Sequence, residues 1–198
     1  YATNLNNGKY KNSGLAQAFK DAMKDGKAGS INFIDFAPYA PSYGAPASFM
    51  STPIISAQGL EGVLIFQMPI DRINSVLQQQ AGMGESGETY IVGSDYLMRS
   101  DSRFAEESTI LKTEVKTETV TKALKGETGI AIVPDYRGIN VLSAYQPLDL
   151  HGVRWALMAE IDEEEVLVPS HTAGFYILMI GVGVLVLVAL LGWYFARS

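Results

Sequence analysis

Hydrophobic and polar residues follow two short-range patterns ahead of residue 166. Apolar residues three or four positions apart, as on one face of an amphipathic helix, predict helices at 14–24, 69–80 and 114–125. Short runs rich in β-branched and aromatic residues, bounded by turn residues, predict strands. The strands are expected at 30–36, 47–55, 62–68, 89–92, 96–99, 129–134, 140–146 and 152–160.

A third pattern is the run Gly174–Phe195, which carries no charged residue. At about 1.5 Å per residue it is long enough to cross a hydrocarbon core about 30 Å thick, so it predicts a transmembrane helix. Aromatic residues mark both of its ends, where amphipathic rings prefer to lie in a bilayer. The acidic run 162–165 precedes the span and Arg197 follows it. The positive-inside rule then places residues 1 to about 170 outside the cytoplasm.

The predicted elements repeat, because the first and the third predicted helices are each followed by three strands and another helix. In both copies the last strand opens on a glycine, Gly62 or Gly152, and ends in Ile-Asp where the next helix begins. We therefore expect an α+β fold of two modules with antiparallel sheets in series, followed by a single C-terminal transmembrane helix. The expected domains are 1–80, the later part of a membrane-distal module; 81–165, a membrane-proximal module; and 166–198, the span and the start of the cytoplasmic side.

The two copies are not equally complete. The second begins with a hairpin predicted at 89–99, whereas residues 1–13 are too few and too polar to supply the matching strands of the first. We therefore expect the first module to be incomplete and the natural protein to continue upstream of Tyr1.

The composition argues against several functions. The chain holds 21 acidic and 15 basic residues and no basic run, so nucleic acid is not an expected partner. It has no cysteine, which suits a bacterial envelope better than a eukaryotic secreted module. The two histidines, His151 and His171, lack a ligand partner at helical spacing, so neither a metal nor a cofactor is expected. No catalytic constellation is legible, and we expect no enzyme.

A match to G-x-G-x-x-G occurs at 82–87. A dinucleotide fingerprint requires a strand before this motif and a helix after it. Here a predicted helix precedes the motif and a predicted strand follows it, so we interpret the stretch as a connector between the modules.

Four stretches carry a resemblance to a known family. They read DFAPYAPSYGAPASFMSTPI at 35–54, GVLIFQMPIDRIN at 62–74, GMGESGETYIVGSDYLMRSDSRF at 82–104 and VLSAYQPLDLHGVRWALMAEID at 141–162. In content and order the chain resembles the double Cache (dCache) sensor domains of bacterial transmembrane receptors, mainly methyl-accepting chemotaxis proteins and related kinases and cyclases. The resemblance implies two PAS/Cache-like modules, the distal one usually binding the ligand between sheet and loop. The chain departs from the pattern in lacking the first span, the long helix that follows it and the distal module's first two strands.

A candidate ligand site lies in the first module. The stretch 37–46 is too rich in proline and glycine for regular structure and carries Tyr39 and Tyr43, whose rings can stack on a ligand and whose hydroxyls can donate to it. Phe49 and Ser51 are two apart on the next strand and so share a face. We expect these four residues to contact a ligand, the alternative being a loop that only packs over the sheet. The resembled family's amino-acid motif of Tyr, Arg, Trp and Asp is not visible, so that ligand class is not supported.

An equivalent pocket in the second module would be lined by Tyr90, Arg99, Asp101 and Tyr145. Arg99 would there pair with a carboxylate on the ligand. The alternative, which we favour from the sequence, is a surface salt bridge beside a filled core. Trp155 is expected to belong to that core.

The sequence thus predicts the extracytoplasmic ligand-sensing region of a transmembrane signal-transduction receptor, acting in chemotaxis. We expect a homodimer in the cell membrane, in which a small molecule of unidentified class shifts the helix that runs from Asp162 into the span. The alternative is a membrane-anchored accessory or structural subunit that uses Cache-like modules for protein contacts.

Overall fold

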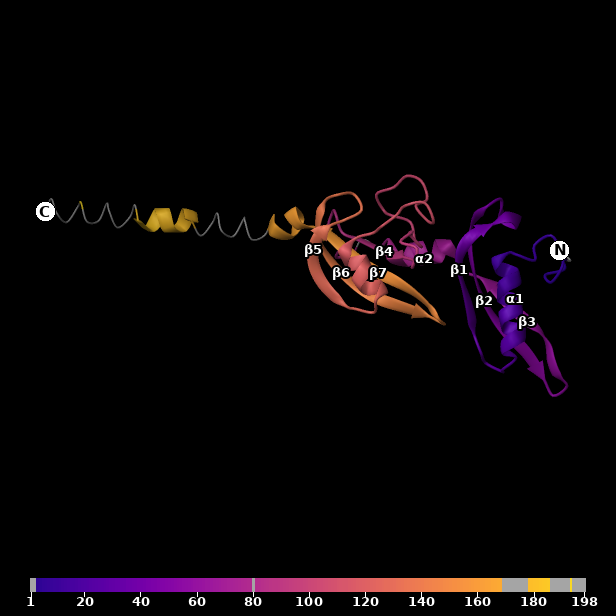
Figure 1. The fold of residues 1–198 in the computed structure, drawn as a ribbon. Coiled ribbons are helices and arrows are strands. Elements are labelled where there is room, and N and C mark those ends of the chain that lie inside the picture. Colours follow the sequence, from indigo (N-terminus) through magenta and orange to yellow (C-terminus); the bar gives the residue numbers. More distant parts are fainter. Residues whose placement is uncertain (1–2, 80, 169–177, 186–192, 194–198) are drawn as a thin grey trace.

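The computed structural model describes residues 3–79, 81–168, 178–185 and 193, and within them the chain forms two antiparallel sheets with helices packed on them (Figure 1). The first unit contains α1 (Gly14–Asp25), β1 (Asn32–Tyr39), η1 (Ala40–Ser42), β2 (Ala45–Ser56) and β3 (Gly59–Gln67). The connecting helix is α2 (Ile70–Leu77). The second unit contains β4 (Glu88–Val92), α3 (Glu118–Leu124), β5 (Gly129–Pro134), β6 (Asn140–Leu150) and β7 (Val153–Asp162).

The first sheet has the strand order β1-β2-β3, and α1 packs on it. Ser13 begins the helix because its hydroxyl accepts the N–H of Ala16, and Gly26 ends it in the left-handed conformation that glycine adopts readily. Between the helix and the sheet lie Ala18, Ala47 and Phe49, all of them buried. The prediction of a helix at 14–24 followed by three strands is confirmed.

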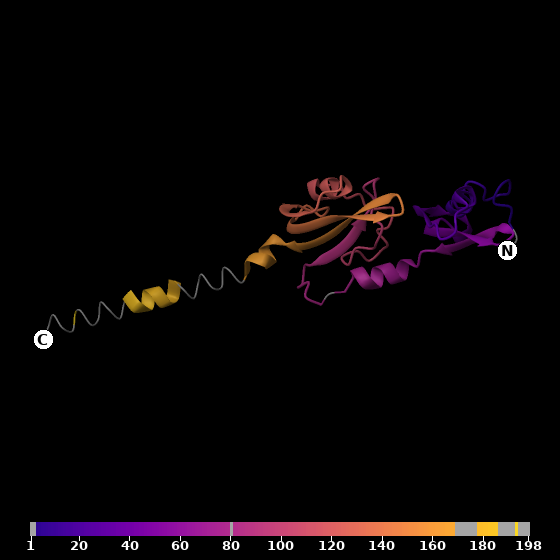
Figure 2. The same ribbon diagram turned by 90° about the horizontal axis from the view of Figure 1, so that it is seen from below.

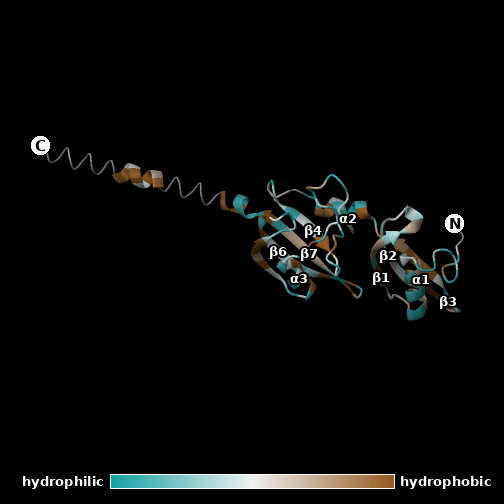
Figure 3. Ribbon diagram, turned by 45° about the horizontal axis from the view of Figure 1, so that its top comes forward, coloured by the Kyte–Doolittle hydropathy of each residue, from teal (hydrophilic) through white to brown (hydrophobic). Residues whose placement is uncertain are grey.

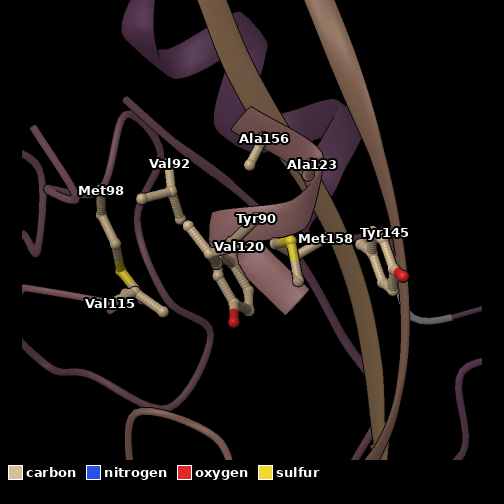
Figure 4. Packing of buried hydrophobic residues seen from close by; sticks show 9 residues of the cluster. All are labelled: Tyr90, Val92, Met98, Val115, Val120, Ala123, Tyr145, Ala156 and Met158. Carbon is tan, nitrogen blue, oxygen red and sulfur yellow. The ribbon is translucent and has the colours of Figure 1, made fainter. Parts of the chain in front are cut away.

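The second sheet has the order β4-β7-β6-β5, and α3 packs on it. The core between them is an apolar cluster in which Tyr90, Val120 and Met158 lie close together (Figure 4). The buried members of this cluster are Tyr90, Val92, Met98, Val115, Val120, Ala123, Tyr145, Ala156 and Met158. No strand of this sheet is parallel to its neighbour, as expected for an α+β fold.

A second apolar cluster joins the two sheets. Its buried members are Phe33 and Phe36 from β1, Ile91 from β4 and Trp155 from β7. Apolar side chains of α2 pack against the same cluster, since this helix runs from the end of β3 toward the second unit (Figure 2). The core prediction for Trp155 is confirmed, although the core that it joins lies between the units.

Two local predictions are wrong. The stretch 37–46 is not irregular, because β1 extends to Tyr39, β2 begins at Ala45 and one turn of 3₁₀-helix joins them. Its prolines do not interrupt the ladder, since Pro38 and Pro46 face one another near the end of the hairpin, where a missing N–H is tolerated. Likewise 96–99 is not a regular strand, because its pairing with neighbours is reduced to two isolated bridges.

The predicted span falls mostly outside the described residues. Residues 178–185 are helical and mostly hydrophobic (Figure 3). Their apolar side chains are largely exposed. Over the residues that the structure describes, no helix is both long and apolar enough to cross a membrane. Ahead of this region β7 ends at Asp162, and residues 163–168 are helical, as the sequence predicts for the segment that leads toward the span.

Candidate functional site

Of the four ligand-site residues predicted in the first unit, the structure brings Tyr39 and Phe49 together. Their rings meet edge to face, with centroids 5.1 Å apart. Ser51 lies on the same face of β2 as Phe49, and its hydroxyl donates a 2.8 Å hydrogen bond to the carbonyl of Ala18 in α1. Tyr43 stands apart, fully exposed at the turn between η1 and β2. Phe49 and Ser51 are therefore buried beneath α1, while Tyr43 is the member of the set that reaches solvent.

The four residues predicted in the second unit have separate partners. Tyr90 is fully buried, and its hydroxyl donates to the carboxylate of Glu160 at 2.8 Å. Tyr145 lies in the same core, with its ring against Gly129, where an added Cβ would stand 2.6 Å from the tyrosine oxygen. Asp101 accepts hydrogen bonds from Asn74 of α2 at 2.6 Å and from Ser108 and Thr109 in its own loop. Tyr90 and Tyr145 thus belong to the core of the second unit, while Asp101 ties its loop to α2.

Arg99 forms an ion pair between the two units that the sequence did not predict. Its side chain is 3% exposed, and its Nε and Nη2 donate to the two carboxylate oxygens of Asp35 at 2.9 Å each. Nη2 also lies 3.0 Å from Asp95, and Nη1 donates to the carbonyl of Leu97 at 2.9 Å. Arg99 was predicted to pair with a carboxylate on a ligand, and in this structure its partners are carboxylates of the chain itself. The pair is buried between the two units and is not the surface salt bridge that we favoured.

The electrostatics of this cluster follow from burial and pairing. Burial alone would lower the pKa of Arg99, but the carboxylates of Asp35 and Asp95 raise it above its ordinary value. Partial burial opposes ionisation of Asp95, yet hydrogen bonds from Arg99 and Leu97 hold its pKa below the ordinary value. The guanidinium and the Asp95 carboxylate are therefore charged over the whole physiological range.

Asp35 is the functional residue that sequence reasoning missed. It accepts from the indole N–H of Trp155 at 3.0 Å in addition to Arg99. Trp155 in turn packs edge to face on Phe33 and stacks on Phe36, with centroids 5.3 and 6.0 Å away. The sequence did contain a signal, because Asp35 is two positions after the buried Phe33 and is therefore expected on the same face of the strand. An acidic residue at a position expected to be apolar indicates a buried partner.

A second polar cluster attaches the helical residues 163–168 to the connector 82–87. The carboxylate of Glu165 accepts the backbone N–H groups of Glu85 and Ser86 at 2.9 and 2.8 Å, as well as the hydroxyl of Ser86. Gly84 has a φ of 63°, and a Cβ there would collide with that carboxylate. The glycine-rich motif is therefore a connector, as predicted, and it also forms an anion-binding nest for a side chain of the exit segment.

An open apolar groove of about 480 Å³ lies on the second sheet. Its lining residues alternate with those of the core, so it opens mainly on the sheet face opposite α3. Among the residues predicted to contact a ligand, Tyr145 borders this groove. The lining is formed by Thr89, Thr128, Gly129, Ile130, Ala144, Tyr145, Gln146, Leu157 and Ala159.

Two small antiparallel sheets follow one another along the chain, and the last strand leads directly into the helical residues 163–168. A family model described as the Cache domain matches residues 3–170. This chain belongs to the Cache domain family, which confirms the family resemblance read from the sequence. No curated protein is significantly similar to the chain in sequence.

Solved structures of the same fold include sensory domains of bacterial receptors. The periplasmic sensory domain of the Campylobacter jejuni chemoreceptor Tlp1 is 17% identical over 77% of this chain and 57% of its own, with a TM-score of 0.59. The ligand-binding domain of the Pseudomonas aeruginosa amino acid chemoreceptor PctC, in complex with GABA, is 20% identical over 82% of this chain and 66% of its own, with a TM-score of 0.54. The extracellular domain of mmHK1S-Z2, described as a histidine kinase, is 16% identical over 83% and 64%, with a TM-score of 0.52.

At these identities the likeness concerns the fold. This chain spans 57% of the Tlp1 domain and 66% of the PctC domain. The comparisons therefore establish the fold of this chain, and its ligand, signalling output and oligomeric state are proposed below.

Proposed function

We propose that this chain is the extracytoplasmic ligand-sensing region of a transmembrane signal-transduction receptor. The observation that carries the proposal is the way in which the Cache region ends. The family match closes at residue 170, after β7 has passed into the helical residues 163–168 and directly ahead of the uncharged run Gly174–Phe195. A sensor needs such a continuous connection, because a ligand acts at a distance only through an element that has two arrangements.

The finer parts of the proposal concern output and ligand. Chemotaxis is the output that the likeness to Tlp1 and PctC supports, while the likeness to mmHK1S-Z2 keeps kinase control as the second possibility. A small molecule is the proposed ligand, since the PctC domain was solved with GABA bound. Its proposed contacts are those of the predicted residues that keep some access: Tyr39 and Tyr43 in the first unit, and Asp101 and Tyr145, which borders the apolar groove, in the second. Phe49, Ser51, Tyr90 and Arg99 are buried against partners within this chain and are not proposed as contacts.

The proposed topology has three parts: 1–80 as the later part of the distal module, 81–165 as the proximal module, and 166–198 with the single span Gly174–Phe195. Residues 1 to about 170 would lie outside the cytoplasm, and the receptor would be a homodimer. Because the chain has no cysteine, single introduced cysteines report topology without background. In cells, Ser42→Cys should react with a membrane-impermeant maleimide and Ser198→Cys should not. The reverse pattern would contradict this orientation.

Sensing is tested by joining the chain to the cytoplasmic half of a characterised chemoreceptor and measuring kinase output against a metabolite library. We expect at least one compound to change the output and also to raise the thermal unfolding midpoint of the unfused chain. Tyr43→Ala should then weaken binding tenfold or more, whereas Tyr43→Phe, which keeps the ring, should weaken it less. A compound whose binding is unchanged by Tyr43→Ala would exclude the site in the first unit.

A further inference from the structure

Arg99 is shared between carboxylates that belong to different units. Asp35 lies on β1 of the first sheet and takes two parallel hydrogen bonds from the guanidinium, at 2.9 Å each. Asp95 lies in the turn after β4 of the second unit, 3.0 Å from Nη2. The same guanidinium nitrogen therefore faces one acceptor in each unit, and bidentate pairing makes the contact to Asp35 the geometrically more specific of the two.

The backbone directs Asp35 toward this meeting point. The register of β1 on β2 shifts between Ile34 and Ala37, so Asp35 lies within a bulge. Bulges change the direction of a side chain and are common beside functional sites. Trp155, itself 2% exposed, completes the contact by donating its indole N–H to Asp35. Gly93 leaves room for the guanidinium, because a Cβ there would collide with it.

Arg99 has two carboxylate partners, one in each unit. A buried guanidinium that loses its single carboxylate is strongly unfavourable, because an unpaired charge is then left away from water. Arg99 would not be left in that state without Asp35, since Asp95 and the carbonyl of Leu97 also bind it. Asp95 is itself 47% exposed, so solvent stabilises its charge in either arrangement.

The joint is also connected to the output end of the chain. Trp155 lies near the start of β7, and the same strand runs without interruption to Asp162, where the helical residues 163–168 follow. Strand β7 is the central partner of both β4 and β6. A displacement of the first residues of β7 relative to the first sheet would therefore act along the whole strand, because β7 is hydrogen-bonded to β4 on one side and to β6 on the other.

We propose that Asp35, Arg99 and Asp95 form a two-position joint between the units. In the closed position Arg99 holds both carboxylates and fixes the first sheet against Trp155. In the open position Arg99 is held by Asp95 within the second unit, and the first sheet is released. The exchange couples the first unit to β7 and to the helical residues 163–168 (the exit helix). Its use in signalling rests on the proposed sensing function, whereas its existence does not.

Hydrogen exchange followed by mass spectrometry tests the joint on the full chain in detergent micelles. Asp35→Asn favours the open position, so we expect exchange of the peptides that contain residues 33–37 and 148–155 to increase about tenfold, with α3 unchanged. Asp95→Asn removes the acceptor on which the open position depends, so exchange of the same peptides should fall below that of the wild type. Asp149→Asn is the matched control, because it breaks an exposed ion pair with Arg154 on the same hairpin.

Opposite effects of the two asparagine variants support the joint, since an ion pair with only a structural role would loosen the contact in both. Equal effects, or an Asp35→Asn result equal to that of Asp149→Asn, overturn it. If Asp35→Asn fails to fold, the sign of the Asp95→Asn effect alone decides. No ligand or output domain enters this experiment. A chain that binds no small molecule can still show the joint, and a working sensor can still lack it.

Discussion

Glu160 is a carboxyl group buried in the core of the second unit, 3% exposed. Its oxygens accept hydrogen bonds from Tyr90 and Ser143 at 2.8 and 2.7 Å. Burial raises the pKa of Glu160 above its ordinary value, although these two hydrogen bonds oppose the shift. The pKa of the Tyr90 hydroxyl is raised as well, first by burial and then by the neighbouring Glu160, so this hydroxyl stays protonated and remains a donor.

The raised pKa of Glu160 predicts a loss of stability as the pH rises. In the unfolded chain a glutamate titrates near pH 4.3, and the folded chain keeps its proton to a higher pH. The stability that the protonated form provides is complete below about pH 4.3 and is lost as the pH rises through the folded pKa, with a slope of at most about 1.4 kcal/mol per pH unit. Glu160→Gln should flatten this slope in urea unfolding measured from pH 4 to 8. Glu106→Gln, on an exposed loop, is the control, and an unchanged slope in Glu160→Gln would contradict the assignment.

A substitution at Gly93 tests whether Arg99 has room to move within its ion pair. Because a Cβ at this position meets the guanidinium, Gly93→Ala forces Arg99 to move within a buried ion pair, and we expect a loss of about 2–4 kcal/mol in unfolding free energy. Gly62→Ala is the matched control, since nothing lies within 4 Å of its added Cβ and its backbone is in an ordinary conformation. Chemical denaturation of both variants measures the difference. Equal losses would mean that Arg99 has room to shift.

At this scale the sequence identified residues but not their partners. Arg99 was expected to bind a carboxylate on a ligand, and it binds instead Asp35, 64 positions away, and Asp95. Likewise Tyr90 was placed in a pocket, whereas its hydroxyl is bound to Glu160, 70 positions on. A one-dimensional pattern gives the chemistry of a side chain, but distant pairing depends on strand register and on how the two units pack.

At the scale of elements, α3 shows how a cap sets a boundary. The apolar period predicts a helix from residue 114, yet the helix begins at Glu118 because the side chain of Thr117 accepts the N–H of Val120. The order of strands and helices was predictable, since the helices carry apolar stripes and the strands are short runs rich in β-branched and aromatic residues. The hairpin 37–46 was not, because its prolines indicated a loop while their edge position permits a strand.

Thr117 caps α3 from a partly buried position, and its hydroxyl also lies 3.1 Å from that of the buried Thr119. Thr117→Ala should cost about 1 kcal/mol of unfolding free energy, because the N–H of Val120 loses its acceptor, while Thr117→Ser keeps the hydroxyl and should cost less than half of that. Thermal and urea unfolding measure both variants. If the serine variant is as unstable as the alanine variant, the hydroxyl contributes little and the threonine methyl matters instead.

At the scale of the whole molecule, two routes connect the first unit to the residues that precede the proposed span. One passes through Asp35 and Trp155 into β7. The other follows the chain itself, from β3 through α2 to the glycine-rich connector, whose amides bind Glu165. One carboxylate of the acidic run 162–165, that of Glu165, ties the helical residues 163–168 to the inter-unit connector.

The contact of Glu165 with the connector leads to a prediction about how firmly the exit helix is bound to residues 82–87. The hydroxyl of Ser86 and then the amides of Glu85 and Ser86 stabilise its charged form, so its pKa lies below the ordinary value. The contact is present above about pH 4.3 and is lost as the pH falls through the folded pKa. In ¹⁵N NMR spectra of the chain in micelles, the Ser86 amide should shift with a midpoint below about pH 4.3. Glu165→Ala should abolish this titration and speed amide exchange at Ser86 about tenfold, whereas the exposed Glu164→Ala should do neither. If Ser86 still titrates in Glu165→Ala, another group is responsible, and the exit helix is held to the first unit through β7 alone.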